Sequence, residues 1–76
     1  MLNFVKIEVI IIRYELLNTE IDEELNKRVI KVHDHQEDFT YLYYENEIEE
    51  LDIPGLRSFI IERMDPINIG VYDVPM

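Results

Sequence analysis

The sequence predicts a small α+β domain, in which an antiparallel or mixed sheet of about four strands packs against one helix in the order β-β-β-α-β. Two kinds of pattern lead to this fold class. Several segments rich in β-branched and aromatic residues alternate apolar and polar side chains, as strands do, and one segment repeats its apolar residues at the period of a helix. No repeat, low-complexity tract or linker divides the 76 residues, so residues 1–76 are expected to form one domain.

The first strand is expected at residues 4–17, FVKIEVIIIRYELL, where β-branched residues are dense. Its apolar side chains change face near residues 9–12. A shift of one residue turns every side chain of a strand over, so this change indicates either a β-bulge or a strand centre that is buried on both faces. The polar residues 18–26 follow as a connector, and a single helical turn over residues 20–25 would have a suitable capping pattern.

Two further strands are expected at residues 27–34, KRVIKVHD, and at residues 38–45, DFTYLYYE. The connection between them is short, which favours an antiparallel hairpin. Alternation along the later strand gives it one aromatic face and one mixed face. The aromatic face carries Phe39, Tyr41 and Tyr43, and the mixed face carries Thr40, Leu42 and Tyr44.

The helix is expected at residues 54–64, with Pro54 in its first turn. Four apolar residues of this segment have helical spacing: Leu56, Phe59, Ile60 and Met64. An alternative interpretation places a short helix at residues 45–51 and a strand at residues 57–63. A final strand is expected at residues 67–74, INIGVYDV, whose first residues alternate between apolar and small or polar side chains.

Acidic residues outnumber basic ones by seventeen to seven, which gives a net charge of −10 at pH 7. Direct binding to a nucleic acid is therefore not expected, because such binding requires lysine and arginine to neutralise phosphates. The absence of cysteine excludes disulfides, thiolate metal ligands and cysteine nucleophiles. The longest uninterrupted apolar run is Val9–Ile12, so neither a membrane helix nor a secretory leader is predicted, and a cytoplasmic protein is expected.

The motif HDHQED at residues 33–38 contains both histidines of the chain. On a strand, His33 and His35 would point to the same face, where two imidazoles can bind one metal ion, whereas Asp34 would point to the opposite face. A zinc site needs further ligands, which Glu37, Asp38 or a distant carboxylate would have to supply. Aspartate closes tight turns through the backbone, and the motif is therefore interpreted as a hairpin tip without a metal.

No catalytic or cofactor-binding pattern is found in the sequence. The single serine, Ser58, falls within the predicted helix, and two glycines, Gly55 and Gly70, are too few for a phosphate-binding loop. The acidic stretch EIDEE, residues 20–24, lacks the glycine and the ligand spacing of an EF-hand. Neither an enzyme nor a cofactor is expected.

The strongest candidate for function is the segment 34–52, which holds eight acidic residues and no lysine or arginine. Aromatic rings lie between its two acidic clusters, and rigid aromatics within a polar rim are the usual anchors of protein interfaces. Carboxylates spaced in this way also imitate a row of phosphates. The residues expected to contact a partner are Tyr41, Tyr43, Tyr44, Glu45, Glu47, Glu49, Glu50 and Asp52.

These features predict a non-enzymatic, acidic protein-binding module. It would inhibit a larger protein by covering a basic surface, such as that of an enzyme that handles nucleic acids, in the manner of small inhibitors made by phages and other mobile elements. The alternative is a structural subunit that self-associates, for instance as a homodimer through the apolar first strand. In that case the acidic segment would serve solubility.

Overall fold

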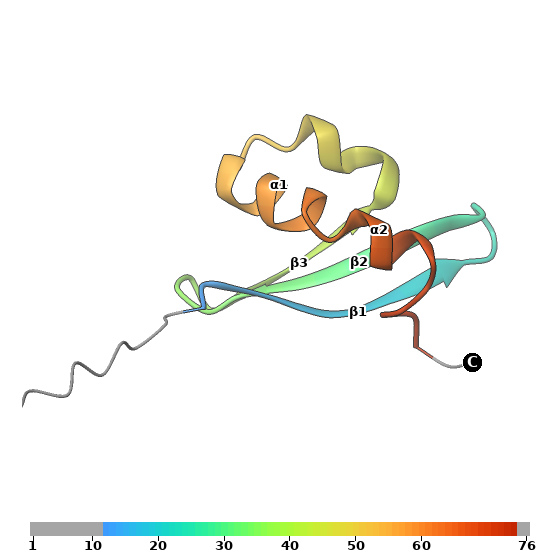
Figure 1. Cartoon of the computed structure of the whole chain (residues 1–76), viewed down its shortest axis with the longest axis horizontal. Helices are drawn as coiled ribbons and strands as arrows, with labels where there is room; N and C mark the ends of the chain where they lie inside the picture. The colour runs from blue at the N-terminus through green and yellow to red at the C-terminus, as the bar shows by residue number, and fades with distance from the viewer. Residues whose placement is uncertain (1–11, 75–76) are drawn as a thin grey trace, which may run out of the picture.

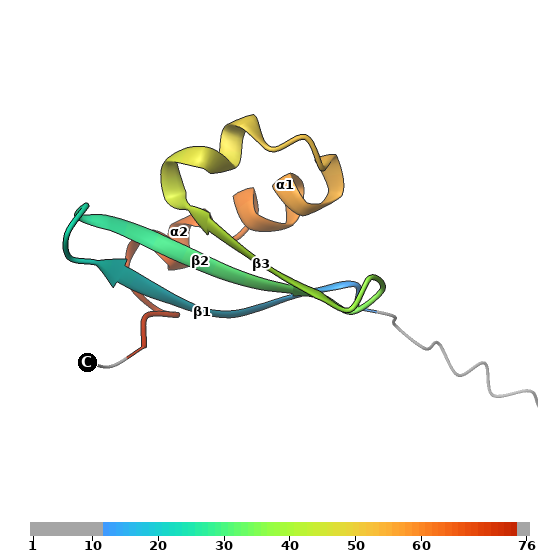
Figure 2. The same cartoon turned by 180° about the vertical axis from the view of Figure 1, so that it is seen from behind.

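The computed structural model describes residues 12–74 and shows three strands followed by three short helical segments (Figure 1). The helical segments lie on one face of the sheet, and no described element covers the opposite face (Figure 1 and Figure 2). The predicted α+β class is confirmed, but the described residues form three strands and not about four, and three short helical segments and not one helix. The strands are β1 (Tyr14–Asp22), β2 (Lys27–Asp34) and β3 (Phe39–Tyr44), in the antiparallel order β1-β2-β3. The helical segments are the 3-10 helix η1 (Glu45–Glu50) and the α-helices α1 (Pro54–Ile61) and α2 (Met64–Asn68).

Both hairpins are closed by the same arrangement of aspartate and backbone. β1 ends at Asp22 and β2 ends at Asp34, and Oδ1 of each carboxylate accepts hydrogen bonds of 3.0 to 3.3 Å from the N–H groups two and three residues further on. Each four-residue turn ends at a residue with positive φ, Asn26 (52°) or Asp38 (50°), which asparagine and aspartate tolerate better than most residues. The interpretation of HDHQED as a hairpin tip is confirmed, and β2 has the predicted bounds 27–34.

The first strand extends further along the chain than predicted. β1 continues to Asp22, so residues 18–22 belong to the sheet and not to a connector, and the proposed helical turn over residues 20–25 is absent. The pairing of β1 with β2 shifts between Leu16 and Asn18. This irregularity places Leu16 opposite Val32 and Thr19 opposite Ile30, so both face the helices. The predicted strand residues 4–11, and with them most of the expected change of face at 9–12, lie outside the described residues.

The helical half differs from the preferred prediction. α1 takes Pro54 as its first residue, as expected, but it ends at Ile61 and not at residue 64. The short helix of the alternative interpretation at residues 45–51 is present as η1, whereas its strand at 57–63 is not formed. Within residues 12–74, no helix is long and apolar enough to cross a membrane.

The predicted final strand at 67–74 is wrong. Its first residues complete α2, and Gly70 then adopts a φ of +82°, the conformation in which glycine commonly ends a helix. Within the described residues, the tail after α2 pairs with the β1 backbone at one isolated parallel bridge, where the Thr19 N–H donates to the Tyr72 carbonyl and the Val74 N–H donates to the Thr19 carbonyl, both at 2.9 Å. Of the three alternating apolar residues, Ile67 is fully buried in the core, whereas Ile69 and Val71 are largely exposed, so the alternation does not mark a strand.

The core lies between the sheet and the helical segments. Ile30 and Val32 of β2 are fully buried at its centre, and fully or nearly fully buried side chains from each helical segment pack against the sheet. Burying one such side chain contributes roughly 1.5–3 kcal/mol. The core residues from the later half of the chain are Ile48, Leu51, Leu56, Ile60 and Ile67.

Two neighbouring isoleucines of α1 test this arrangement. Ile60 is fully buried, whereas Ile61 is 47% exposed. We expect Ile60→Ala to cost roughly 2–5 kcal/mol and to leave the domain largely unfolded at 25 °C, because a core of this size supplies roughly 3–5 kcal/mol in total. Ile61→Ala, the same chemical change, should cost less than about 1 kcal/mol. Urea unfolding followed by circular dichroism measures both; equal midpoints would contradict the packing described here.

Candidate functional site

An aromatic row (Phe39, Tyr41 and Tyr43) runs along β3. These residues pair with Asp34, Val32 and Ile30 respectively, so they lie on the face of the sheet that carries the helices. The rings of Phe39 and Tyr41 meet edge to face with centroids 4.8 Å apart, and those of Tyr41 and Tyr43 stack at 5.8 Å with an interplanar angle of 14°. Tyr41 and Tyr43 are half-buried against the core, and Phe39 is 55% exposed. The predicted aromatic face is therefore confirmed.

The third tyrosine expected at the site points to the other face of the sheet. The Tyr44 hydroxyl donates a 3.0 Å hydrogen bond to Asp22 Oδ2, and the Lys27 ammonium lies 5.7 Å from the centre of the Tyr44 ring. The bond to Asp22, together with burial, raises the pKa of Tyr44. Burial also raises the pKa of Tyr43, with smaller contributions from Tyr41 and Glu47. The structure therefore groups Tyr41 and Tyr43 and separates Tyr44 from them.

The acidic residues expected at the site follow β3 directly, in η1 and just beyond it; we call residues 45–52 the acidic segment. Glu47 has a structural role, since its Oε1 accepts a 2.9 Å hydrogen bond from the Tyr44 N–H at the start of η1. Glu45 Oε2 lies 3.8 Å from Arg28 Nη1. Within the acidic segment, the exposed carboxylates that take part in no described ion pair or hydrogen bond are those of Glu49, Glu50 and Asp52.

A shallow, open groove lies at the Phe39 end of the aromatic row. Phe39 and Tyr41 form one side of it, and Ile53, which precedes α1, contributes a further apolar surface. Arg13 and Glu37 supply one charge of each sign to its lining. The groove is therefore apolar with a charged rim, which is the composition of a shallow peptide-binding surface and lacks the enclosure of a small-molecule pocket.

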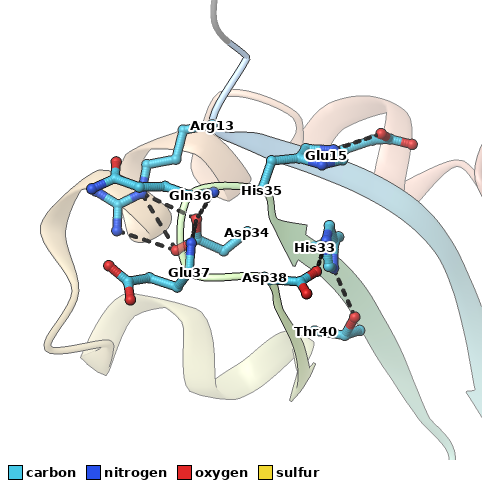
Figure 3. A network of polar contacts seen from close by, with 9 residues as sticks. All are labelled: Arg13, Glu15, His33, Asp34, His35, Gln36, Glu37, Asp38 and Thr40. Carbon is cyan, nitrogen blue, oxygen red and sulfur yellow. Dashed lines mark hydrogen bonds and ion pairs between the residues drawn. The ribbon is translucent and has the colours of Figure 1, made fainter.

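A buried ion pair that sequence reasoning missed holds this end of the molecule together (Figure 3). The side chain of Asp34 has no exposed surface, and the Arg13 guanidinium donates to both of its oxygens at 3.1 to 3.4 Å. The Gln36 and Glu37 N–H groups donate to the same carboxylate at 3.0 and 3.2 Å. The hydrogen bond from Arg13 is the main reason that the pKa of Asp34 is lowered, with a contribution from the two backbone donors and against the opposing effect of burial.

The two histidines of the hairpin lie on the outer face, as their spacing predicts (Figure 3). Their ring centroids are 4.7 Å apart, and Asp34 points to the opposite face. His35 Nε2 lies 2.9 Å from Glu15 Oε1, while His33 lies 2.9 Å from Thr40 Oγ1 and 3.4 Å from Asp38 Oδ1. Among residues 12–74, no group of three or more potential ligands is positioned to hold a metal ion.

A second ion pair fixes the other end of the sheet. The Arg28 guanidinium donates to both oxygens of Asp73 at 3.0 and 3.1 Å, and the Thr19 hydroxyl donates to the same carboxylate. These hydrogen bonds lower the pKa of Asp73, with Arg28 the larger cause. Because Arg28 and Asp73 are 45 residues apart in the chain, no local sequence signal could have revealed their pairing.

Comparison of the chain with models of protein families, with curated proteins and with solved structures found no match.

The lowered pKa of Asp34 predicts a dependence of stability on pH. A carboxyl group whose pKa is lower in the folded state stabilises the fold above its unfolded pKa, near 4, and loses that contribution as the pH falls through the folded value. Asp34→Asn can keep the turn through its amide oxygen but loses the charge beside Arg13. We therefore expect a lower unfolding midpoint at pH 7 and a weaker loss of stability below pH 4.

Asp38→Asn is the matched control, since Asp38 lies in the same turn with its side chain 95% exposed and asparagine accepts its positive φ. Thermal unfolding at several pH values, followed by circular dichroism, compares the two variants. If both show the same pH dependence as the original chain, the ion pair does not carry the acid sensitivity.

Proposed function

We propose that this protein is a non-enzymatic, acidic protein-binding module that covers a basic surface on a larger protein and thereby inhibits it. The observation that supports this most is the position of the aromatic row directly before the acidic segment on one edge of the sheet. Apolar rings and unpaired carboxylates on neighbouring surfaces match what a basic partner requires: an area to bury and a complementary charge.

The aromatic row would supply most of the affinity. Tyr41 and Tyr43 are held by stacking and by the core, so little side-chain freedom remains to be lost on binding. Phe39 is the most exposed ring of the aromatic row and offers apolar area at the edge of the groove for a partner to cover. The surface is thus largely ordered before a partner arrives.

The acidic segment would supply attraction and selectivity. The exposed carboxylates of Glu49, Glu50 and Asp52 lie in a chain with a net charge of −10, which favours encounter with basic surfaces and disfavours acidic ones. Surfaces that bind nucleic acids are the most common strongly basic surfaces on proteins, and carboxylates compete there with phosphates. We therefore propose an enzyme that handles nucleic acids as the target, and the cytoplasm as the place where the two meet.

The experiment is a comparison of two triple variants with the original chain in a pull-down from a lysate of the source cells. Glu49→Lys/Glu50→Lys/Asp52→Lys removes the exposed acidic segment. Glu20→Lys/Glu23→Lys/Glu24→Lys makes the same change of net charge at exposed positions around the first hairpin. We expect one larger protein to be captured by the original chain and by the control variant, to be lost at high salt, and to bind the acidic-segment variant at least tenfold more weakly.

Binding that survives in the acidic-segment variant, with unchanged salt dependence, would contradict the proposal. Capture of the protein's own copies alone, equally at low and high salt, would favour the self-associating subunit instead. Circular dichroism of both variants checks that the fold is intact, since neither triple change touches a described hydrogen bond of a side chain.

A further inference from the structure

We infer that the free edge of β3 accepts an extended, basic segment of the partner as an additional strand of the sheet. This inference rests on the proposed function and specifies how the partner is bound. It identifies the bound element by its backbone and charge: a chain in extended conformation, rich in arginine or lysine, that pairs along β3 as far as Tyr43, because the Tyr44 N–H already donates to Glu47 Oε1.

The two edges of the sheet differ in how well their backbone groups are protected from pairing with another strand. On the β1 edge, an irregularity follows Leu16, and the tail forms two backbone hydrogen bonds with Thr19. β3 forms the opposite edge, and within residues 12–74 no strand pairs with its outer side (Figure 2). Natural proteins usually guard such an edge with charged residues, proline or a bulge. The sequence of β3, FTYLYY, contains neither charge nor proline, and its pairing with β2 is regular.

The charges around this edge favour a basic occupant. The turn before β3 carries Glu37 and Asp38, and the acidic segment follows β3 directly, so carboxylates lie at both ends of an uncharged strand. From residue 32 to residue 56 the chain has no lysine or arginine. The guanidinium groups of Arg13 and Arg28, which lie near the two ends of β3, are paired with Asp34 and Asp73. The neighbouring cations Lys27 and Lys31 lie on β2 and not on the free edge. A second copy of this chain would bring further negative charge to the same edge, which argues against it as the occupant.

The aromatic row favours particular side chains on an added strand. Neighbouring strands lie about 4.8 Å apart, so alternate side chains of an added strand would lie beside Phe39, Tyr41 and Tyr43. Arginine suits these positions because its guanidinium stacks on aromatic rings and attracts carboxylates. The protein already contains one such contact, with the Arg63 guanidinium 3.7 Å from the centre of the Phe59 ring.

Two synthetic peptides test this inference on the full chain. The first alternates arginine and valine over nine residues and has blocked ends. The second has the same sequence, with methyl groups on the backbone nitrogens of two adjacent central residues, so that neither of its edges offers an unbroken row of N–H donors. Charge and side chains are identical, and only strand pairing distinguishes the peptides. Binding is measured by calorimetry at low salt, and protection of the β3 amides by NMR hydrogen exchange.

We expect the unmethylated peptide to bind about tenfold more tightly or better, since each lost pair of backbone partners weakens binding by several-fold, and to slow exchange of amides in β3. Equal binding of both peptides would overturn strand addition while leaving the acidic surface of the proposed function intact. Absence of binding by either peptide up to millimolar concentration would also overturn it. So would a dimer, detected by light scattering, in which the outer amides of β3 are protected without any peptide.

Discussion

The fold depends on covering one face of a three-stranded sheet with very little chain. The helical segments contain six, eight and five residues, and helices this short are not stable in water by themselves. They persist because each places at least one fully or nearly fully buried side chain in the core cluster that contains Ile30 and Val32. The sheet in turn needs them, because a meander with one apolar face is unstable until that face is covered. Sheet and helices are therefore expected to form together.

Two carboxylates link distant segments of the chain, one at each end of the sheet. Asp34 joins the start of β1 to the second hairpin through Arg13, and Asp73 joins the tail to both β1 and β2 through Thr19 and Arg28. Each carboxylate accepts several hydrogen bonds, which offset the cost of burying the Asp34 side chain completely and the Asp73 side chain in part. Acidic residues in this protein thus divide into a few that position the chain and a larger number that remain at the surface.

Local signals predicted the second hairpin, because its turn is encoded by aspartate and its strands by simple alternation. They missed the first hairpin, because residues 18–22 are polar, as in a connector, although they continue β1. The tail was mispredicted because the alternation of Ile67, Ile69 and Val71 is compatible with a strand, whereas Gly70 and the pairing of Asp73 with Arg28 impose a turn. In the candidate site, alternation correctly placed Tyr41 and Tyr43 together. The contact of Tyr44 with Asp22 on the other face, and the ion pairs of Asp34 and Asp73, depend on residues distant in the chain and have no local signature.

The uncharged edge of β3 has a consequence for the behaviour of the protein in concentrated solution. A regular, exposed strand with no charge or proline within it can act as a template for uncontrolled growth of β-aggregates. Here the protection comes from outside the strand: carboxylates flank both of its ends, and a net charge of −10 makes copies repel one another before their edges can meet. Such protection acts at a distance and so leaves the edge open to a molecule of opposite charge. It also fails when salt screens the charge or acid neutralises it. The solubility of this protein is therefore expected to fall at high ionic strength and at low pH.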